Sequence, residues 1–271
     1  MSLKNRLNDF KLIAHRGASY DAPENTLEAF DLALENGFDN VETDVQLSSD
    51  GRAVLIHDDT LDRTTNGSGV VTETTFADIK ALSAGDWFQG PDDSVGLKEP
   101  SAYANARIPT LDEFCERYAG KLHLHLELKS SQPRLAEVSR RSLERWGWLA
   151  QHSDELIAPG LTISSFNFVQ LERSVQLMPQ IAHGWLLREI TEEAVAAAVR
   201  LGLTGIYPHA SDVTTTHVEL ANNAGLFVRT WGIGCSRQAL DQAYRAGARG
   251  TTIDWPSQAR DYLGNNSRRL A

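Results

Sequence analysis

Seven polar residues in the first half of the chain have the side-chain types that phosphate chemistry requires. Each stands at the end of, or just beyond, an apolar run typical of a β-strand. They are His15, Arg16, Glu42, Asp44, His57, Glu127 and Lys129. Cleavage of a phosphodiester requires positive charge at the non-bridging oxygens, a base for the nucleophile and an acid for the leaving alkoxide. The set offers a candidate for each task, so the sequence predicts phosphate chemistry.

The carboxylates Glu42, Asp44 and Glu127 form a ligand set that suits a hard divalent cation, and the pattern leaves Mg²⁺ and Ca²⁺ open. Arg16 can hold a phosphate through two parallel hydrogen bonds, and Lys129 adds a point charge. The structural alternative is that Glu42 and Asp44 pair with an Arg or Lys inside the fold, while Glu127 forms an ion pair with Lys129.

Two histidines, His15 and His57, are able to exchange protons near neutral pH. A histidine considered alone is more often a hydrogen-bonded structural residue. Beside Arg16 and Asp44, however, the two are candidates for a general acid and a general base.

Composition predicts one α/β domain without a nucleic-acid partner. A length of 271 residues with 41% apolar content is sufficient for an α/β barrel, so we expect residues 1–271 to form one domain. The formal charge of −10 argues against nucleic-acid binding, which needs a basic surface. A phosphate site must then supply its own positive charge. No feature of the sequence indicates an oligomeric state.

The cysteines and the N-terminal residues favour the cytoplasm. Cys115 and Cys235 stand far apart and in no metal-ligand spacing, which suits two free thiols in a reducing compartment. Residues 1–9 lack the apolar core of a signal peptide, and no stretch reaches the roughly 18 apolar residues of a membrane span. We therefore expect a cytoplasmic protein with no membrane span.

β-like runs alternate with amphipathic helices along most of the chain, which predicts a parallel sheet with helical crossovers. The runs cover residues 11–15, 39–47, 53–57, 122–129, 161–165, 182–187, 204–208, 226–231 and 250–254. Nine runs are one too many for an eight-stranded barrel. The turn at Asp50-Gly51 leaves no room for a crossover helix, so run 53–57 should lie antiparallel on run 39–47. A turn centred there pairs residues whose numbers sum to 101, which places Asp44 opposite His57.

Run 122–129 shows a regular alternation. Every even position is Leu and every odd position is polar. Since side chains alternate across a strand, His123, His125 and Glu127 should point into a barrel lumen while the leucines face helices. We expect the two histidines to be hydrogen-bonded lumen residues.

Residues 58–108 interrupt the alternation of strands and helices, and we expect them to form an insertion over the barrel mouth, with a short helix around 75–83. Three helix starts are also predicted. Asn25 with Glu28 and Thr110 with Glu113 fit capping boxes, and Ser236 can cap a later helix.

Five sequence blocks within residues 12–129 occur in a diagnostic order. They are Ala14-His15-Arg16-Gly17, Ala22-Pro23-Glu24-Asn25-Thr26, Val41-Glu42-Thr43-Asp44-Val45, His57-Asp58-Asp59-Thr60-Leu61-Asp62-Arg63-Thr64-Thr65-Asn66-Gly67 and Leu126-Glu127-Leu128-Lys129. Looser matches follow at Ser164-Ser165-Phe166, Val228-Arg229-Thr230-Trp231 and Gly250-Thr251-Thr252-Ile253-Asp254-Trp255-Pro256. Together these blocks resemble the motifs of the glycerophosphodiester phosphodiesterase family over nearly the whole chain.

This resemblance implies a distorted (β/α)₈ TIM barrel that hydrolyses a glycerophosphodiester to sn-glycerol 3-phosphate and an alcohol. It also implies three groups of site residues. By role these are the catalytic pair His15 and His57, the substrate-binding residues Arg16, Lys129 and Trp231, and the ligands of a divalent cation, Glu42, Asp44 and Glu127. The route of related phospholipases suggests the hypothesis that the glycerol 2-hydroxyl attacks first, giving a cyclic phosphate, and water second.

The chain departs from the family pattern near its last strands. It has Trp231-Gly232-Ile233-Gly234 where Trp-Thr-Val-Asn is usual, and Thr251-Thr252 where apolar residues are usual. His125 stands where Asn is common. We expect these changes to alter the pocket and not the catalytic set. His209 follows run 204–208 and is either a substrate contact or an ordinary loop histidine.

Two other functions compete with this interpretation. A lysophospholipase D-type activity would need a wider and more apolar mouth than residues 58–108 suggest. A catalytically silent barrel that only binds a phosphorylated ligand would need the cations, but it would not need both His15 and His57.

Overall fold

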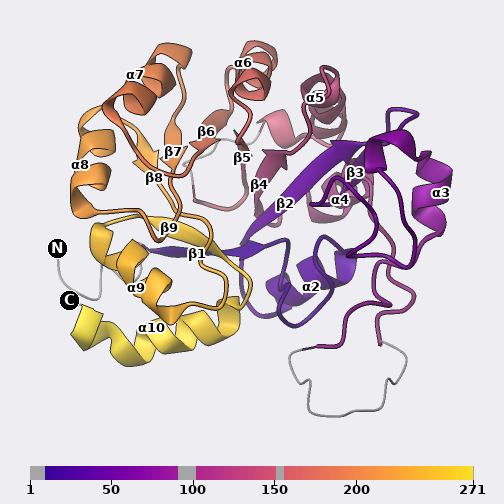
Figure 1. The fold of residues 1–271 in the computed structure, drawn as a ribbon, viewed down its shortest axis with the longest axis horizontal. Helices are drawn as coiled ribbons and strands as arrows, with labels where there is room; N and C mark the ends of the chain where they lie inside the picture. Colours follow the sequence, from indigo (N-terminus) through magenta and orange to yellow (C-terminus); the bar gives the residue numbers. More distant parts are fainter. Residues whose placement is uncertain (1–9, 91–101, 151–155, 271) are drawn as a thin grey trace.

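The computed structural model describes residues 10–90, 102–150 and 156–270, and its strands form one sheet curled into a barrel (Figure 1). Eight parallel strands follow the order β8-β7-β6-β5-β4-β2-β1-β9. Their bounds are β1 Lys11–His15, β2 Asn40–Leu47, β4 His123–Leu128, β5 Gly160–Ser165, β6 Ala182–Leu186, β7 Gly205–Tyr207, β8 Phe227–Val228 and β9 Gly250–Ile253. A hydrogen bond from the Thr252 amide to the Thr230 carbonyl, 3.1 Å long, helps to join the two ends of the sheet. The TIM barrel expected from the sequence is confirmed.

Helices surround this barrel, and one of them, α3, lies beside the hairpin formed by β2 and β3 (Ala53–Leu55) (Figure 1). They are α2 Leu27–Glu35, α3 Phe76–Ala81, α4 Leu111–Tyr118, α5 Leu135–Arg145, α6 Phe168–Leu177, α7 Glu192–Leu201, α8 Thr215–Asn223, α9 Arg237–Ala246 and α10 Pro256–Leu270, with short 3₁₀ turns η1 Val71–Glu73 and η2 Trp148–Ala150. Two predicted starts are confirmed. Thr110 and Glu113 form a reciprocal capping box at α4, and the Ser236 side chain accepts from the Ala239 amide at α9. No helix in the described ranges has both the length and the apolar character of a membrane span.

The predicted cap at Asn25 is wrong. Helix α2 is capped instead by Thr26, whose hydroxyl accepts from the Ala29 amide. Asn25 adopts a left-handed conformation, with φ of +57°, which Asn tolerates better than most residues. Its side chain turns toward β2, where it donates to Asp44 Oδ2 at 3.0 Å and accepts from Thr43 Oγ1 at 2.6 Å. Asn25 therefore holds β2 and not the helix start.

The hairpin forms as predicted, but the pairing register that we predicted for it is wrong. Strand β3 (Ala53–Leu55) lies antiparallel on β2 with Gln46 opposite Val54, so paired numbers sum to 100 and Asp44 does not face His57. The ladder extends to Ser48 and Arg52, which leaves a three-residue turn with Gly51 in the left-handed conformation at φ +80°. That extra turn residue shifts every pair by one. The last bond of this ladder joins the Ile56 amide to the Asp44 carbonyl at 3.1 Å, and the chain then leaves it, so that His57 reaches the cleft at the barrel mouth.

Alternation along β4 separates the apolar shell from the polar lumen. Leu124, Leu126 and Leu128 are fully buried in the main apolar cluster, which includes residues of α4 and α5. On the other face, the ring of His123 stacks on that of His125 with 4.5 Å between centroids. The predicted orientation of this strand is confirmed.

Residues 58–90 and 102–108, the described part of the segment 58–108, pack beside the hairpin, at the right of Figure 1. The helix predicted around 75–83 is α3. Apolar residues of this segment form a small cluster with Val54 and Ile56 from the hairpin; they are Leu61, Val71, Ile79, Ala84 and Ile108. No described residue of the segment lines the cleft presented next. Part of the predicted insertion, residues 91–101, and the N-terminal residues 1–9 lie outside the described ranges.

Candidate active site

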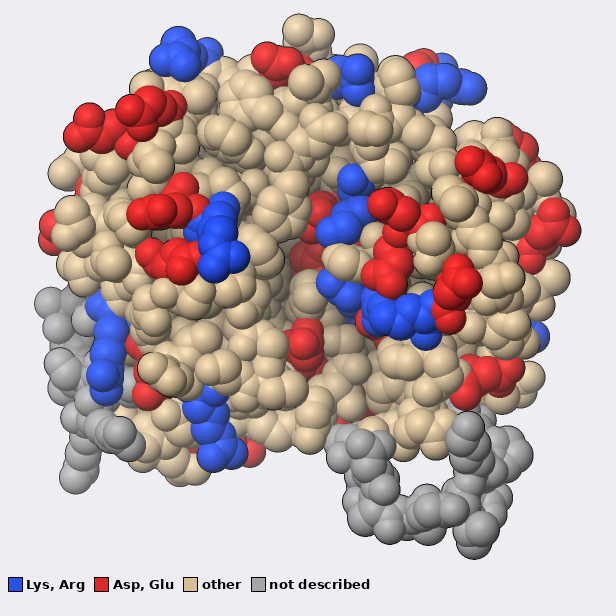
Figure 2. Space-filling view, in the orientation of Figure 1, with Lys and Arg blue, Asp and Glu red and all other residues tan. Residues whose placement is uncertain are grey.

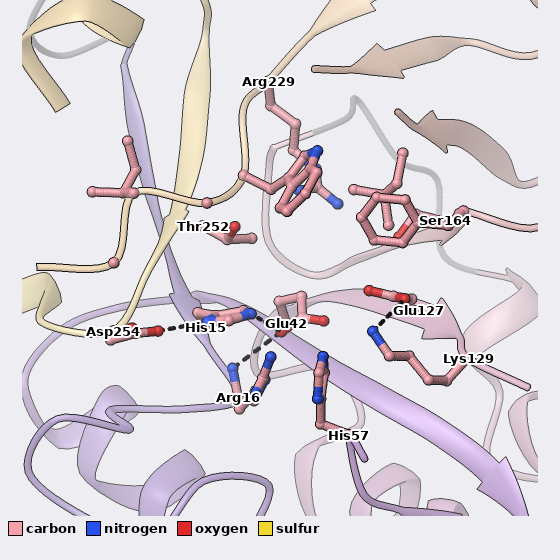
Figure 3. Close-up of a pocket in the computed structure, with 16 residues that line it drawn as sticks. His15, Arg16, Glu42, His57, Glu127, Lys129, Ser164, Arg229, Thr252 and Asp254 are labelled. Carbon is pink, nitrogen blue, oxygen red and sulfur yellow. Dashed lines mark hydrogen bonds and ion pairs between the residues drawn. The ribbon is translucent and has the colours of Figure 1, made fainter. Parts of the chain in front are cut away.

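A cleft at the carboxyl ends of the strands gathers residues that are far apart in the sequence (Figure 3). Its volume is about 400 Å³. Seven of the eight residues expected at the site line it: His15, Arg16, Glu42, His57, Glu127, Lys129 and Trp231. The eighth, Asp44, is fully buried beside them. Figure 2 shows a hollow near the middle of this face, with acidic and basic side chains along its right edge and a second group of charged side chains to its left.

Neighbouring strands supply three carboxylates at matching heights. Glu42 on β2 lies beside His15 on β1, and Asp44 on β2 lies beside Glu127 on β4. Residues two apart on a strand share a face, so Glu42 and Asp44 both point to the lumen side. One oxygen from each of the three carboxylates lies within 4.8 Å of the others. The acidic cluster predicted from the sequence is therefore present.

Burial, mutual repulsion and the neighbouring cations shift the pKa values of the three carboxyl groups in different directions. Burial and the charge of Asp44 raise the pKa of Glu42 to about 8, and the same two causes raise the pKa of Glu127. Burial also acts on Asp44, but Arg16 and Lys129 outweigh it and lower the pKa to about 2. Arg16 Nε lies 3.2 Å from Asp44 Oδ2, and Lys129 Nζ lies 3.8 Å from Oδ1. Asp44 Oδ1 is buried and accepts no hydrogen bond.

The turn after β1 explains the His-Arg-Gly sequence. Arg16 and Gly17 both have left-handed backbones, with φ of +57° and +85°. A Cβ on Gly17 would lie 2.6 Å from the backbone of Ala29, so a side chain does not fit there. This turn also aims the Arg16 amide at Glu42, where it donates to Oε2 at 3.1 Å.

His15 is fixed by a residue near the other end of the chain. Because β9 lies beside β1, Asp254 comes next to His15, and its Oδ1 lies 2.5 Å from the imidazole Nδ1. The Nε2 atom lies 3.8 Å from Glu42 Oε2. Burial and Arg16 lower the pKa of His15, but Glu42 and Asp254 outweigh them, so the pKa lies above its ordinary value. The imidazole is therefore suited to holding a proton.

A chain of ion pairs connects His57 to Arg16. His57 Nδ1 lies 2.7 Å from Asp58 Oδ1. Arg63 donates through Nε to Asp58 Oδ2 at 2.7 Å and through Nη1 to Glu24 Oε2 at 2.6 Å. Glu24 Oε1 in turn accepts from Arg16 Nη1 at 2.7 Å. Burial and the nearby cations outweigh the carboxylates and lower the pKa of His57, which favours the neutral imidazole.

The opposite wall of the cleft is mainly apolar. It includes Phe166, Leu186, Trp231 and Ile233. The rings of Phe166 and Trp231 meet edge to face with 4.8 Å between centroids, and Trp231 Nε1 donates to the Leu187 carbonyl at 3.0 Å. Trp231 is thus a fixed part of this wall.

Gly232 stands where the family usually has Thr, and the structure gives a reason for the glycine. Gly232 has a left-handed backbone with φ of +78°, and a Cβ there would lie 2.2 Å from His209 Nε2. The His209 ring also packs edge to face on Trp231 at 4.6 Å, while its Nδ1 contacts Ser211 Oγ at 2.7 Å. His209 is not among the residues that line the cleft. It supports the back of Trp231, and the glycine makes room for it.

Several residues to which the sequence analysis assigned no role hold the expected ones in place. They are Glu24, Asp58, Arg63 and Asp254, together with the misassigned Asn25. All of them lie within the sequence blocks quoted above, and two also had a positional signal: Asp58 directly follows His57, and Asp254 directly follows a strand that had to close the barrel. Arg63 and Glu24 are 39 residues apart, so their contact has no local pattern.

In this TIM barrel the ionisable side chains at the carboxyl ends of the strands meet in one cleft. Barrel enzymes have their active sites at this place, so the fold and the cleft define a barrel enzyme. The combination of buried carboxylates, cations and paired imidazoles suits a reaction at phosphorus.

Comparisons with known proteins agree with that class. The sequence profile of the glycerophosphoryl diester phosphodiesterase family matches residues 15–256. A glycerophosphodiester phosphodiesterase of Caldanaerobacter subterraneus is 32% identical over 249 residues, covering 90% of this chain and 94% of the relative. A solved phosphodiesterase of Oleispira antarctica, in complex with the product sn-glycerol-3-phosphate, is 34% identical with a TM-score of 0.78, covering 94% of this chain and 96% of that one. The chain belongs to the glycerophosphoryl diester phosphodiesterase family and is a phosphoric diester hydrolase.

Proposed function

We propose that this enzyme hydrolyses glycerophosphodiesters to sn-glycerol 3-phosphate and an alcohol with the help of a bound divalent cation. The observation that carries the proposal is the buried cluster of Glu42, Asp44 and Glu127, in which Asp44 Oδ1 has no hydrogen-bond partner. The product seen in the Oleispira antarctica relative supports the choice of substrate class.

The donor set fits a hard cation. All three side chains are carboxylates, which Mg²⁺ and Ca²⁺ both accept as ligands. Burial and the charge of Asp44 raise the pKa values of Glu42 and Glu127 even though Lys129 Nζ donates to Glu127 Oε1 at 3.0 Å, so a bound cation would stabilise the ionised cluster. Glu42, Asp44 and Glu127 would hold the cation, which would neutralise charge on the phosphate oxygens.

Proton transfer is assigned to the two imidazoles. Each has a carboxylate at its Nδ1 atom, Asp254 for His15 and Asp58 for His57, which leaves Nε2 available for transfer. His57, with its lowered pKa, is suited to accept a proton from the nucleophile. His15, with its raised pKa, is suited to donate one to the leaving oxygen. Arg16 and Lys129 would bind the phosphate.

The first nucleophile in this proposal is the glycerol 2-hydroxyl, which would give a cyclic phosphate that water then opens. The two steps need opposite proton transfers, and a pair of imidazoles can perform both. A glycerophosphodiester that lacks the 2-hydroxyl should therefore react slowly. Unimpaired hydrolysis of that substrate would remove the cyclic route and leave direct attack by water.

The main test measures alcohol release from glycerophosphocholine, glycerophosphoethanolamine and glycerophosphoglycerol, with and without a chelator. We expect hydrolysis that a chelator abolishes and that added Mg²⁺ or Ca²⁺ restores. Activity that survives complete metal removal would contradict the assignment of the three ligands. Hydrolysis of lysophospholipids in preference to these substrates would favour the lysophospholipase D-type alternative, and absence of any hydrolysis would favour the silent binding barrel.

Two wider properties belong to the same proposal. Residues 1–271 would form one domain, since the apolar cluster of segment 58–108 includes Val54 and Ile56 of the barrel hairpin. The enzyme would work in the cytoplasm, because Cys115 and Cys235 are both free thiols, as a reducing compartment favours.

A further inference from the structure

Arg229 is a buried cation without a carboxylate partner. The residue follows β8, its side chain is 1% exposed, and its Nε and Nη1 atoms make no hydrogen bond. Within the described ranges no Asp or Glu oxygen lies within 4.0 Å of its guanidinium. Burying a charge in this way is costly unless something else compensates it.

The surroundings of Arg229 compensate its charge only in part. Its Cζ atom lies 4.0 Å from the ring centroid of Tyr207, a cation–π contact that leaves the N–H groups unsatisfied. Gly184 and Gly205 make room for that ring, since a Cβ on either would lie 2.5 Å or less from it. The arrangement holds the guanidinium firmly on one side and supplies no negative charge.

The nearby histidines do not offset the charge of Arg229 either, because an imidazole is neutral or positively charged. Burial lowers the pKa of His123 to about 4, and Arg229 adds to that effect. Burial also lowers the pKa of His125, to which His123 and Arg229 contribute. Nδ1 of His125 is itself buried without a hydrogen-bond partner.

Arg229 belongs to the wall of the cleft, although its Nε and Nη1 atoms are buried. It lines the cleft together with Ser164 and Thr252, across from His15 and Glu42 (Figure 3). The Ser164 hydroxyl is also buried without a hydrogen-bond partner. Two unsatisfied polar side chains, one of them a guanidinium, thus lie on one side of the cleft, and Ser164 borders the acidic cluster because it is the neighbour of Glu127 across β4 and β5.

We propose that Arg229 and Ser164 form a second anion-binding subsite, which takes a carboxylate or phosphate group. A guanidinium binds such groups through two parallel hydrogen bonds, and a hydroxyl can add a third. The anionic group is either a second charged group of the substrate or a free anion. The substrate case rests on the proposed function, whereas the free-anion case does not.

Two substrates that differ by one carboxylate provide the test of the substrate case. Glycerophosphoserine equals glycerophosphoethanolamine with an added carboxylate, so the ratio of their kcat/KM values isolates that group. We expect the wild-type enzyme to favour glycerophosphoserine and Arg229→Gln to lower the ratio by about tenfold. Arg229→Lys should retain part of the preference. Arg200→Gln, an exposed position on α7, is the matched control and should leave the ratio unchanged.

Calorimetry with inorganic phosphate tests the free-anion case without any turnover. Phosphate should bind at the cationic side of the cleft and at the second subsite in the wild type, and the second binding event should be absent in Arg229→Gln. If Arg229→Gln does not fold, Ser164→Ala provides a milder variant. It should lower the preference for glycerophosphoserine and weaken phosphate binding at the second subsite, each by about threefold.

The outcomes separate the possibilities. A reduced ratio identifies the substrate's own anion as the ligand, and loss of phosphate binding alone identifies a free anion. If neither the ratio nor phosphate binding changes, or if all substrates lose activity equally while phosphate binding is kept, the subsite does not exist and Arg229 is structural. Failure of the wild type to cleave any glycerophosphodiester would overturn the proposed function, while phosphate binding would still decide the subsite.

Discussion

The two sides of the cleft are built on different principles. On the side formed by β1, β2, β4 and the segment after β3, charged groups contact opposite charges, as Arg16 does with Glu24 and Asp44. On the side formed by β5 to β8, aromatic and aliphatic side chains dominate, and Arg229 is the one charged residue among the described residues that line it. Groups fixed by several ion pairs suit chemistry that tolerates little movement, whereas a less polar wall suits binding. Substitutions should therefore lower turnover on the first side and change affinity or preference on the second.

The largest effect is expected for His57→Ala. Loss of a proton-transfer group should reduce kcat by at least about 100-fold, with little change in KM. Steady-state kinetics with glycerophosphocholine measures both constants. A near-normal kcat would mean that His57 is structural and that the charged side does not carry the chemistry.

A smaller effect, visible mainly in the pH profile, is expected for Asp254→Asn. In the wild type, activity should rise with pH as His57 loses its proton and fall as His15 loses its own. The Asp254 carboxylate raises the pKa of His15, so its removal should shift the alkaline limb to lower pH and reduce kcat by about 30-fold. An unchanged alkaline limb would show that His15 is not the proton donor.

Arg63→Gln tests whether the ion-pair chain positions His57. Arg63 lowers the pKa of Asp58 and also contacts Glu24, so its loss should reduce kcat by about tenfold, and more strongly at acid pH. Arg63→Lys should restore part of the rate. A uniform loss at every pH, without rescue by Lys, would indicate a folding defect in place of a positioning role.

The smallest effect is expected on the apolar side, for Trp231→Ala. Loss of this wall should raise KM by about fivefold and leave kcat within about twofold, which corresponds to about 1 kcal/mol of binding. Trp231→Phe should retain most of the affinity. A fall in kcat as large as that of His57→Ala would erase the distinction between the two sides.

Local patterns in the sequence predicted the elements well. Alternation along 122–129 and the strand-end positions of Glu42 and Glu127 follow from the two-residue period of a strand, which is a property of neighbouring residues. The same reasoning predicted the acidic cluster, because parallel strands end at the same edge of a barrel.

Details that depend on a single backbone conformation were not predictable in this way. The hairpin register changed by one because Ser49 joined the turn, in which Gly51 is left-handed, and Asn25 left the helix start for the same kind of conformation. Contacts across the fold were also missed. Asp254 binds His15 from 239 residues away, and Arg229 was indistinguishable from an ordinary polar residue at a strand end.

The contact between His15 and Asp254 has a consequence for how the enzyme is made. The strand that carries the carboxylate is the last of the sheet, and it lies against the first. A chain growing on the ribosome therefore lacks this partner until nearly all of it has been synthesised. Hydrolytic competence should appear late and abruptly during translation, so that incomplete chains do not degrade cellular phosphodiesters.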